Sequence, residues 1–291
     1  MASGSVPAVT RKRAKWSGTR LALNLFLIGA SVLAVYPFLV MLFGSLKEPR
    51  EISTNPGGPP LEPTLANYVE LFTGESGAVM WRSILNSIIV SVPFTALTVL
   101  LCAMAGYAFT KYRFRGSNVL FAVLLASMLI PAEVNIPALY LFFSQIDWLN
   151  TYQVQIFPGT ASVLGMFMAR QYMSSMPTEV LEAARIDGAG HWRTFWSVAV
   201  PMSAPILGAI AVLTFVAKWS DYLWPKVMVG DPTFQPAMVV LPALSTGISG
   251  FIVHYEILLA GALVITIPIL IVFLRFQDKL MNGTTAGAVR G

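Results

Sequence analysis

Six long segments without a charged residue run through this sequence, and they limit its fold more than any other feature. They are Leu21–Leu46, Ser83–Thr110, Gly116–Ala132, Trp148–Ala169, Thr194–Ala217 and Ile257–Leu274. A helix needs about 20 mainly apolar residues to cross the hydrocarbon core of a bilayer. A helix also satisfies all of its backbone polar groups within one segment. The sequence therefore predicts an all-α, polytopic membrane protein with six transmembrane helices, the third continuing toward Ile146.

The overall composition supports a membrane setting. Hydrophobic residues make up 56% of the chain and charged residues 11%, with a mean hydropathy of +0.68. Soluble domains carry about 25% charged residues, so this chain lacks the charge to cover a water-facing surface of that kind. We therefore interpret the net charge of +5 as a signal of membrane topology and not of nucleic-acid binding.

A seventh apolar segment, Phe234–Val253, is interpreted differently. It contains Pro236, Pro242, Gly247 and Gly250, which disfavour a continuous lipid-facing helix. We expect an irregular or re-entrant loop that packs against protein. Prolines also fall inside the six long segments and predict kinks there. These are Pro37, Pro93, Pro131, Pro158, Pro205 and Pro268.

The distribution of basic residues favours six spans over seven. With six spans and a cytoplasmic N-terminus, most of the 19 basic residues fall on the inner side, as the positive-inside rule requires. Seven spans would export the basic residues near the C-terminus. The outer side keeps Lys47, Arg50, Arg82, Lys218 and Lys226.

Three regions are expected along the chain. Residues 1–18 are predicted to be a disordered, basic cytoplasmic N-terminus. Residues 19–280 hold the six-helix transmembrane domain, and residues 281–291 form a cytoplasmic tail. The first apolar segment is longer than the apolar region of a signal peptide, so it is expected to stay as an anchor.

The most polar loop, residues 170–193, contains a motif of small residues. It reads Glu182-Ala183-Ala184-Arg185-Ile186-Asp187-Gly188-Ala189-Gly190. Small side chains let another protein approach the backbone closely, and Glu182 offers an acid to a basic pocket on that protein. Glycine tolerates the left-handed conformation that ends many helices. The motif predicts a short helix that docks onto a partner.

This motif resembles the EAA loop of ABC importer permeases. The likeness continues in Asn150-Thr151-Tyr152, the run from Glu182 to Pro201, the aromatic stretch Lys218–Pro225 and the tail Thr285–Gly291. Taken together, residues 20–291 resemble the smaller membrane subunit of maltose-type sugar importers. The resemblance implies a type I permease half that carries a mono- or oligosaccharide across the bacterial plasma membrane.

The resemblance also implies partners and the absence of chemistry on this chain. A second permease subunit would complete the pathway, two cytoplasmic ATPases would bind ATP and Mg, and an extracytoplasmic sugar-binding protein would deliver the sugar. No Gly-x-x-x-x-Gly-Lys-Ser/Thr motif occurs in the sequence. We therefore expect no cofactor or metal on this chain and no enzymatic activity.

Three groups of site residues follow from the resemblance. The coupling helix would use Glu182, Ala183, Ala184, Asp187, Gly188 and Gly190. The C-terminal tail would enter the interface between the ATPases through Thr285, Ala286, Gly287 and Arg290. A loop that reaches into the binding protein would consist of Ser245, Thr246, Gly247, Ile248, Ser249 and Gly250.

Glu133 is an unusual acid within an apolar region. On a straight helix from Gly116 it would stand roughly 26 Å along the axis, near the outer face. Acids in membrane segments often line a pathway, so Glu133, Asn135 and Tyr140 are candidate pathway residues. The alternative is that Glu133 at this height is simply exposed to water and lines no pathway. Trp148, Trp219 and Trp224 are further candidates for stacking against a sugar. The alternative is that they belong to an aromatic belt at the membrane interface.

Two other functional classes remain open at this level. A secondary transporter of small polar solutes would need ion-coordinating residues at mid-membrane and usually inverted repeats. A polytopic membrane enzyme would need a cluster of reactive side chains near one face. The single cysteine, Cys102, is expected to be a packing residue. The two histidines, His191 and His254, lie too far apart in sequence to suggest a metal site.

Overall fold

The fold was analysed in a computed structural model that describes residues 18–74, 77–112, 114–245 and 253–285. Within these ranges every regular element is helical. The α-helices are α1 (Gly18–Ser45), α2 (Pro49–Thr54), α3 (Ala66–Thr73), α4 (Gly77–Lys111), α5 (Ser117–Ser127), α6 (Ile136–Gln145), α7 (Tyr152–Ile156), α8 (Val163–Ser174), α9 (Thr178–Ile186), α10 (His191–Thr194), α11 (Val200–Met202), α12 (Ala204–Trp219), α13 (Leu223–Met228), α14 (Ala237–Ser245) and α15 (Tyr255–Thr285). Other helical turns are η1 (Ala132–Asn135), η2 (Phe195–Ala199, a π-helical turn) and η3 (Pro232–Phe234).

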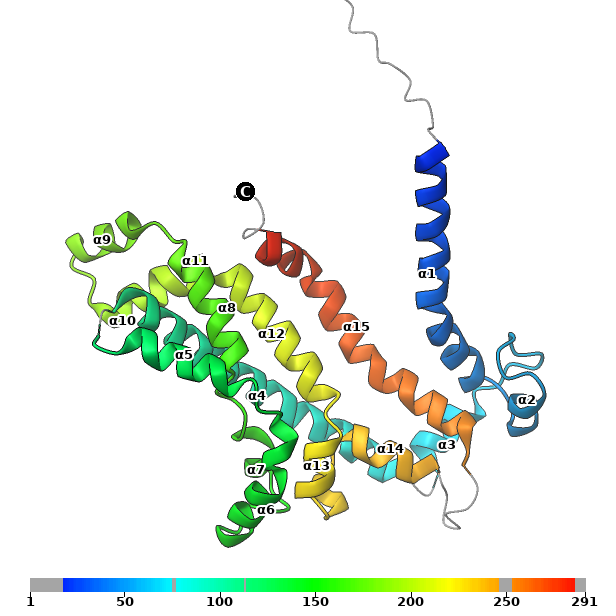
Figure 1. The fold of residues 1–291 in the computed structure, drawn as a ribbon. Coiled ribbons are helices and arrows are strands. Elements are labelled where there is room, and N and C mark those ends of the chain that lie inside the picture. Colours follow the sequence, from blue (N-terminus) through cyan, green and yellow to red (C-terminus); the bar gives the residue numbers. More distant parts are fainter. Residues whose placement is uncertain (1–17, 75–76, 113, 246–252, 286–291) are drawn as a thin grey trace, which may run out of the picture.

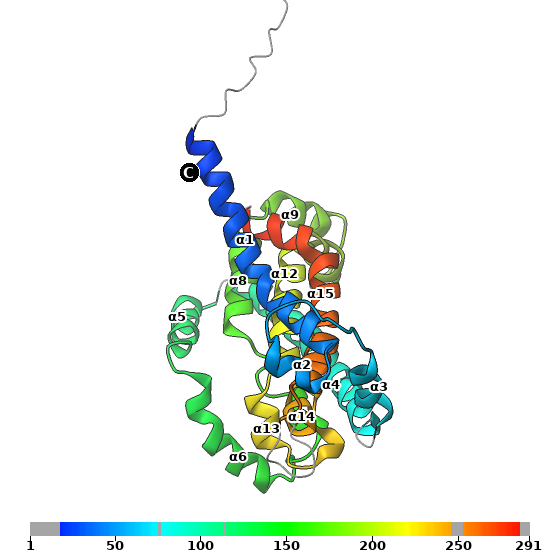
Figure 2. The same ribbon diagram turned by 90° about the vertical axis from the view of Figure 1, so that its right-hand side faces the viewer.

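Helices α4, α8, α12 and α15 pack side by side and form the body of the molecule (Figure 1). At one end of this body lie α9 and the C-terminal end of α15. At the other end lie α2, α3, α6, α7, α13 and α14 (Figures 1 and 2). Helix α1 packs on α15 near its own C-terminal end, whereas its residues 20–39 are exposed and rise away from the body.

The membrane-spanning candidates take two forms. By length and composition, α1, α4 and α15 each suffice to cross a bilayer as one helix. Two further candidates are bent pairs, Ser117–Ser127 with Ala132–Gln145 at 86° and His191–Met202 with Ala204–Trp219 at 76°. The described residues thus hold three spans, or up to five if each bent pair counts as one.

The expected continuous span Trp148–Ala169 is not one helix. It is divided into α7, which ends at Ile156, and α8, which begins at Val163 and runs on to Ser174. The break contains Pro158 and Gly159, and Gly159 has a φ of +84°. With 12 residues, α8 is about 18 Å long, so it is too short to cross the hydrocarbon core alone.

Prolines break some helices here and leave others intact. Helices α1, α4 and α15 continue through Pro37, Pro93 and Pro268. The breaks come where another helix-disfavouring residue is near: Gly159 after Pro158, Pro201 before Pro205, and Pro137 after Pro131. A lone proline leaves one carbonyl without its helical partner, and neighbouring helices in a bundle tolerate this.

Helices α4 and α8 approach each other closely through small residues. A Cβ atom added to Gly106 would lie 2.7 Å from the Cβ of Ala169 and 2.9 Å from the backbone nitrogen of Arg170. A Cβ at Gly165 would lie 2.6 Å from the Sγ of Cys102. Small residues at helix contacts are typical of membrane bundles, where close van der Waals packing drives association. Buried Cys102 therefore packs as expected.

The segment expected to be re-entrant is short and packed against protein. Helix α14 contacts α4 and α15, and its side chains Ala237, Val239, Val240 and Leu241 are buried. The Ser87 hydroxyl accepts a hydrogen bond from the Ala237 N–H at 2.9 Å. Residues 246–252 lie outside the described ranges.

A buried lysine organises the loop between α1 and α3. The Lys47 ammonium is fully buried and donates to the carbonyls of Asn55 and Gly58, the latter at 2.7 Å. Asn67 donates to the carbonyls of Ser45 and Lys47, both at 2.9 Å. These bonds satisfy a buried cation and fix the α2 loop against the end of α1.

Replacing Gly106 by Val is expected to loosen the α4–α8 contact, because the added atoms meet backbone that has no room to move. Overpacking of this kind costs about 1–3 kcal/mol. The matched control is Gly29→Val in α1, where no atom lies within 4 Å of the added Cβ. Thermal unfolding in detergent should show a Tm several degrees lower for Gly106→Val only. Equal Tm values for the two variants would contradict this packing.

Candidate functional site

Helix α9 projects from one end of the body, and Leu181 anchors it there. Leu181 is 4% exposed and belongs to a cluster with residues of α4, α8 and α12. On the same helix Glu182 and Ala183 are exposed, and Ala184 is partly exposed. The motif residues expected to meet a partner therefore stand on the open side of α9.

The end of α9 is a Schellman motif built on Gly188. Gly188 has a φ of +80°, the left-handed region that glycine adopts without strain. The Ala189 N–H donates to the Ala184 carbonyl at 2.9 Å, the bond that defines the motif. The Asp187 N–H donates to the Ala183 carbonyl at 3.0 Å. Gly190, in contrast, has a φ of −67° and precedes α10.

The loop around α9 also exposes large apolar side chains. Ile186 is 86% exposed and Trp192 is 66% exposed, while Val180 and Trp196 are exposed to a lesser extent. An apolar surface beside an acid and a stretch of alanines is suited to a protein contact. The surface is defined here as the α9 face: Val180, Glu182, Ala183, Ile186 and Trp192.

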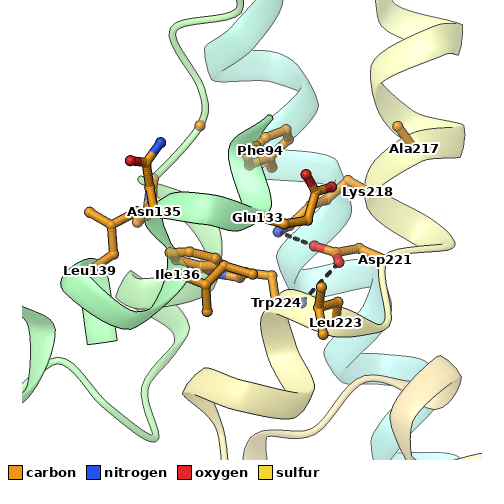
Figure 3. Close-up of a pocket in the computed structure, with 13 residues that line it drawn as sticks. Phe94, Glu133, Asn135, Ile136, Leu139, Ala217, Lys218, Asp221, Leu223 and Trp224 are labelled. Atoms are coloured by element: carbon orange, nitrogen blue, oxygen red, sulfur yellow. Dashed lines mark hydrogen bonds and ion pairs between the residues drawn. The ribbon is translucent and has the colours of Figure 1, made fainter. Parts of the chain in front are cut away.

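A cavity of about 400 Å³ lies where three segments stop being helical (Figure 3). Its walls come from the α5–α6 break, the α7–α8 break and the end of α12, and from Phe94, which stands halfway along α4. Irregular backbone at membrane depth occurs where it lines a cavity or is buried in protein. The lining residues are Phe94, Ala132, Glu133, Asn135, Ile136, Leu139, Pro158, Gly159, Ala217, Lys218, Asp221, Leu223 and Trp224.

An ion pair forms one wall of this cavity. The Lys218 ammonium lies 3.0 Å from the Asp221 carboxylate, and the Lys218 side chain is only 8% exposed. The other carboxylate oxygen of Asp221 accepts a hydrogen bond from the backbone N–H of Trp224 at 3.3 Å. The same ammonium lies 4.9 Å from the centroid of the Phe94 ring, a cation–π distance. Figure 3 shows the two bonds to Asp221 as dashed lines.

The expected pathway residues are brought together in part. Glu133 and Asn135 both line the cavity, but Figure 3 shows Glu133 on the side of the η1 turn that faces Lys218 and Asp221, with Asn135 on the opposite side. Tyr140 is not among the lining residues and is 40% exposed. The height estimated for Glu133 on a straight helix was wrong, because α5 ends at Ser127 and the chain turns by 86°.

Of the aromatic candidates, only Trp224 faces the cavity. Its indole N–H donates to the Val154 carbonyl at 2.8 Å, which fixes the ring. Trp219 is buried and donates to the Ile265 carbonyl at 2.9 Å. Trp148 stacks on Phe143 in another cluster. The sequence placed Lys218 on the outer side of the membrane. In the structure its ammonium pairs with Asp221 and lies over the Phe94 ring of α4. The spacing of Lys218 from Asp221, three residues on, was the one signal of this pair in the sequence.

A second cavity, of about 250 Å³, adjoins the first. The two share Phe94, Gly159 and Ala217 as lining residues. Thr98 lines the second cavity, and its hydroxyl is fully buried without a hydrogen-bond partner among the described residues. Ser162 and Thr214 line it as well. The two cavities thus follow each other along α4, and both carry polar groups.

The Asn150-Thr151-Tyr152 segment is tied by hydrogen bonds to the chain between α13 and α14. Asn150, with a φ of 58°, accepts the N–H groups of Gly230 and Asp231 through its side-chain oxygen at 2.7 and 2.9 Å. The Tyr152 hydroxyl donates to Asn86, which itself donates to two carbonyls of the loop. Hydrogen bonds from Thr233 hold the pKa of Asp231 below its usual range, because they favour the carboxylate.

Several expected site residues lie outside the described ranges. Ser245 ends α14, whereas Thr246, Gly247, Ile248, Ser249 and Gly250 are outside. Thr285 ends α15, whereas Ala286, Gly287 and Arg290 are outside. Among the residues that are described, no three His, Cys, Asp or Glu side chains are grouped so that they could hold a metal ion.

The chain is similar to known membrane transport proteins. A family model described as "Binding-protein-dependent transport system inner membrane component" matches residues 99–284. The arabinooligosaccharides transport system permease protein AraQ of Bacillus subtilis is 30% identical, over 97% of this chain and 99% of its own. The trehalose/maltose transport system permease protein MalG of Thermococcus litoralis is 31% identical, over 92% of this chain and 96% of its own.

A solved structure shares the fold. It belongs to a bacterial ABC transporter involved in the import of the acidic polysaccharide alginate, and it matches 91% of this chain and 98% of its own with a TM-score of 0.79. The sequence identity is 20%, so this likeness establishes the architecture alone.

Replacing Gly188 by Ala is expected to loosen the end of α9. An L-residue in the left-handed region costs roughly 1–2 kcal/mol, whereas Gly190→Ala meets no positive φ and no neighbouring atom. Amide hydrogen exchange of residues 184–189 should therefore be roughly fivefold faster or more in Gly188→Ala than in Gly190→Ala. Identical exchange in the two variants would argue against a constrained turn.

Proposed function

Since the chain belongs to the binding-protein-dependent transport system inner membrane component family, we propose that it imports a mono- or oligosaccharide as one permease subunit of an ATP-driven ABC transporter. The observation that carries this is a full-length match to permeases named for arabinooligosaccharides and for trehalose and maltose. The chain is a transport subunit and not an enzyme. ATP and Mg bind on separate ATPase subunits.

The α9 face is the proposed contact with those ATPases. Leu181 ties α9 to a cluster that includes Tyr107 of α4, Met173 of α8 and Ile210 of α12. Helices α4 and α12 also supply Phe94 and Lys218 to the cavity wall. Closure of the ATPases would therefore move α9 and, through this cluster, the helices that line the cavity.

A second permease subunit is proposed to complete the pathway. Residues 21–39 of α1 are exposed and mostly apolar, and this part of the helix stands apart from the body (Figure 1). A related permease offers a surface of the right length and polarity for it. The cavities line only one side of a route, so the facing side is assigned to this second subunit.

We propose that the end of the molecule that carries α9 is cytoplasmic. Basic residues there are Lys111 at the end of α4, Arg193 in α10 and Arg275 in the C-terminal third of α15. This agrees with the positive-inside rule. The opposite end, with α2, α6 and α14, would face the binding protein in the extracytoplasmic space of a bacterial cell, and residues 245–250 would enter its cleft.

A secondary transporter of small polar solutes is the less favoured alternative. The bent helix pairs and the cavity would suit such a protein. However, the relatives that match along nearly the whole chain are permeases of binding-protein-dependent systems. The α9 face also has no role in a transporter that works without ATPases.

Glu182→Lys is expected to uncouple the complex without preventing its insertion. A charge-assisted contact contributes about 1.5–3 kcal/mol, so its reversal should lower sugar-stimulated ATPase activity about tenfold or more. The measurement is ATP hydrolysis and sugar uptake in proteoliposomes that contain both permeases, the ATPases and the sugar-loaded binding protein.

The control for this variant is Glu182→Asp, which keeps the negative charge at the same position of α9. It should keep most of the stimulated activity. Normal uptake by Glu182→Lys would refute the proposed coupling role. A wild-type assembly that takes up no sugar when given a loaded binding protein would refute the proposed function itself.

The tail offers a separate test of the ATPase contact. Deletion of Thr284–Gly291 should leave membrane insertion intact and lower sugar-stimulated ATPase activity, because small residues and Arg290 suit a narrow interface between the two ATPases. A Gly-Ser tail of equal length serves as the control and should not restore activity. Unchanged coupling after deletion would remove the tail from the mechanism.

A further inference from the structure

The larger cavity has the size and chemistry of a small-molecule site. At about 400 Å³ it falls within the roughly 300–1,000 Å³ that such sites occupy. Most of its wall is apolar or aromatic, and a few charged and amide groups converge on it. Pockets with this combination hold ligands by apolar contact and orient them by polar contact.

The ion pair in the wall retains hydrogen-bonding capacity. Each Asp221 oxygen has one partner among the described residues, Lys218 or the Trp224 N–H, although a carboxylate accepts about four hydrogen bonds. The Lys218 ammonium carries three donors and spends one on Asp221. A hydroxyl both donates and accepts, so a polyol can bond to the carboxylate and the ammonium together.

Two aromatic rings complete the site. Phe94 lies under the Lys218 ammonium, and Trp224 is fixed by its bond to the Val154 carbonyl. Fixed rings offer the apolar C–H face of a sugar a surface that needs no ordering on binding. The site therefore combines stacking surfaces with hydroxyl partners.

The charge of the cavity restricts what it accepts. Lys218 and Asp221 neutralise each other, and Glu133 has no ion-pair partner within the described part of the chain. The formal charge of the lining is therefore −1. A uronate or a phosphorylated sugar would bring a further negative charge beside Glu133 and Asp221, and like charges repel each other.

The adjoining cavity of about 250 Å³ is also lined in part by polar residues. Its lining includes the hydroxyl residues Thr98, Ser162 and Thr214, so polar residues also line the space next to the first cavity.

From these observations, and resting on the proposed function, we infer that this subunit carries its own carbohydrate subsite, formed by Phe94, Glu133, Lys218, Asp221 and Trp224. The subsite binds neutral sugar units and excludes anionic ones. Selection by charge therefore takes place in the membrane as well as on the binding protein.

The test is ligand binding to the assembled permease–ATPase complex without the binding protein. Saturation-transfer NMR in detergent is recorded with arabinotriose, maltotriose and diacetylchitobiose as neutral probes and digalacturonate as the anionic probe. We expect binding of at least one neutral probe and none of digalacturonate. Asp221→Asn should weaken neutral binding at least fivefold, whereas Asp147→Asn, at an exposed position that Asn also suits because its φ is positive, should leave it unchanged.

A second variant tests the charge argument and does not alter the ion pair. Glu133 is exposed on the η1 turn, so Glu133→Lys should fold, reverse the sign of the cavity and allow digalacturonate to bind. Overturning results are binding of no neutral probe, neutral binding that Asp221→Asn leaves unchanged, and equal binding of digalacturonate by the wild type. ATPase activity stimulated by the binding protein is measured in the same preparation. A complex that shows this activity but none of the binding signals overturns the carbohydrate subsite and leaves the proposed function standing.

Discussion

The close contact of α4 with α8 is the constraint on which the rest of the structure depends. Gly106 meets Ala169, and Gly165 meets Cys102, with no space for a larger side chain at either glycine. Membrane helices gain little from apolar burial against one another, because lipid is equally apolar, so such close packing has to supply the attraction. The contact holds α8 against α4, and α9 follows α8 after three residues.

The same helices connect the two functional regions of the chain. The cluster that holds Leu181 includes residues of α4, α8 and α12, and it lies between the α9 face and the cavities. Packed clusters transmit displacement because their side chains have no free space to absorb it. In the proposed function, a force applied at Glu182 would be passed through this cluster to the helices that carry Phe94 and Lys218.

Helix breaks create the cavity, and their positions were only partly foreseeable. Prolines at 131, 158 and 205 coincide with breaks, whereas those at 37, 93 and 268 lie in continuous helices. One proline removes one hydrogen bond, which a bundle tolerates; a second disfavouring residue nearby ends the helix. The straight-helix assumption also misplaced Glu133, since a turn of 86° at the end of α5 separates it from the helix axis.

By itself, the sequence determined the helical class, the membrane setting, the α9 motif and the need for glycine at position 188. Each of these follows from local chemistry: apolar length, charge distribution and backbone freedom at one residue. Only the tertiary structure decided that Lys218, Asp221, Glu133 and Phe94 share one cavity. These residues come from three different helical segments, and their meeting depends on helix breaks and on close packing between helices, which no local pattern encodes.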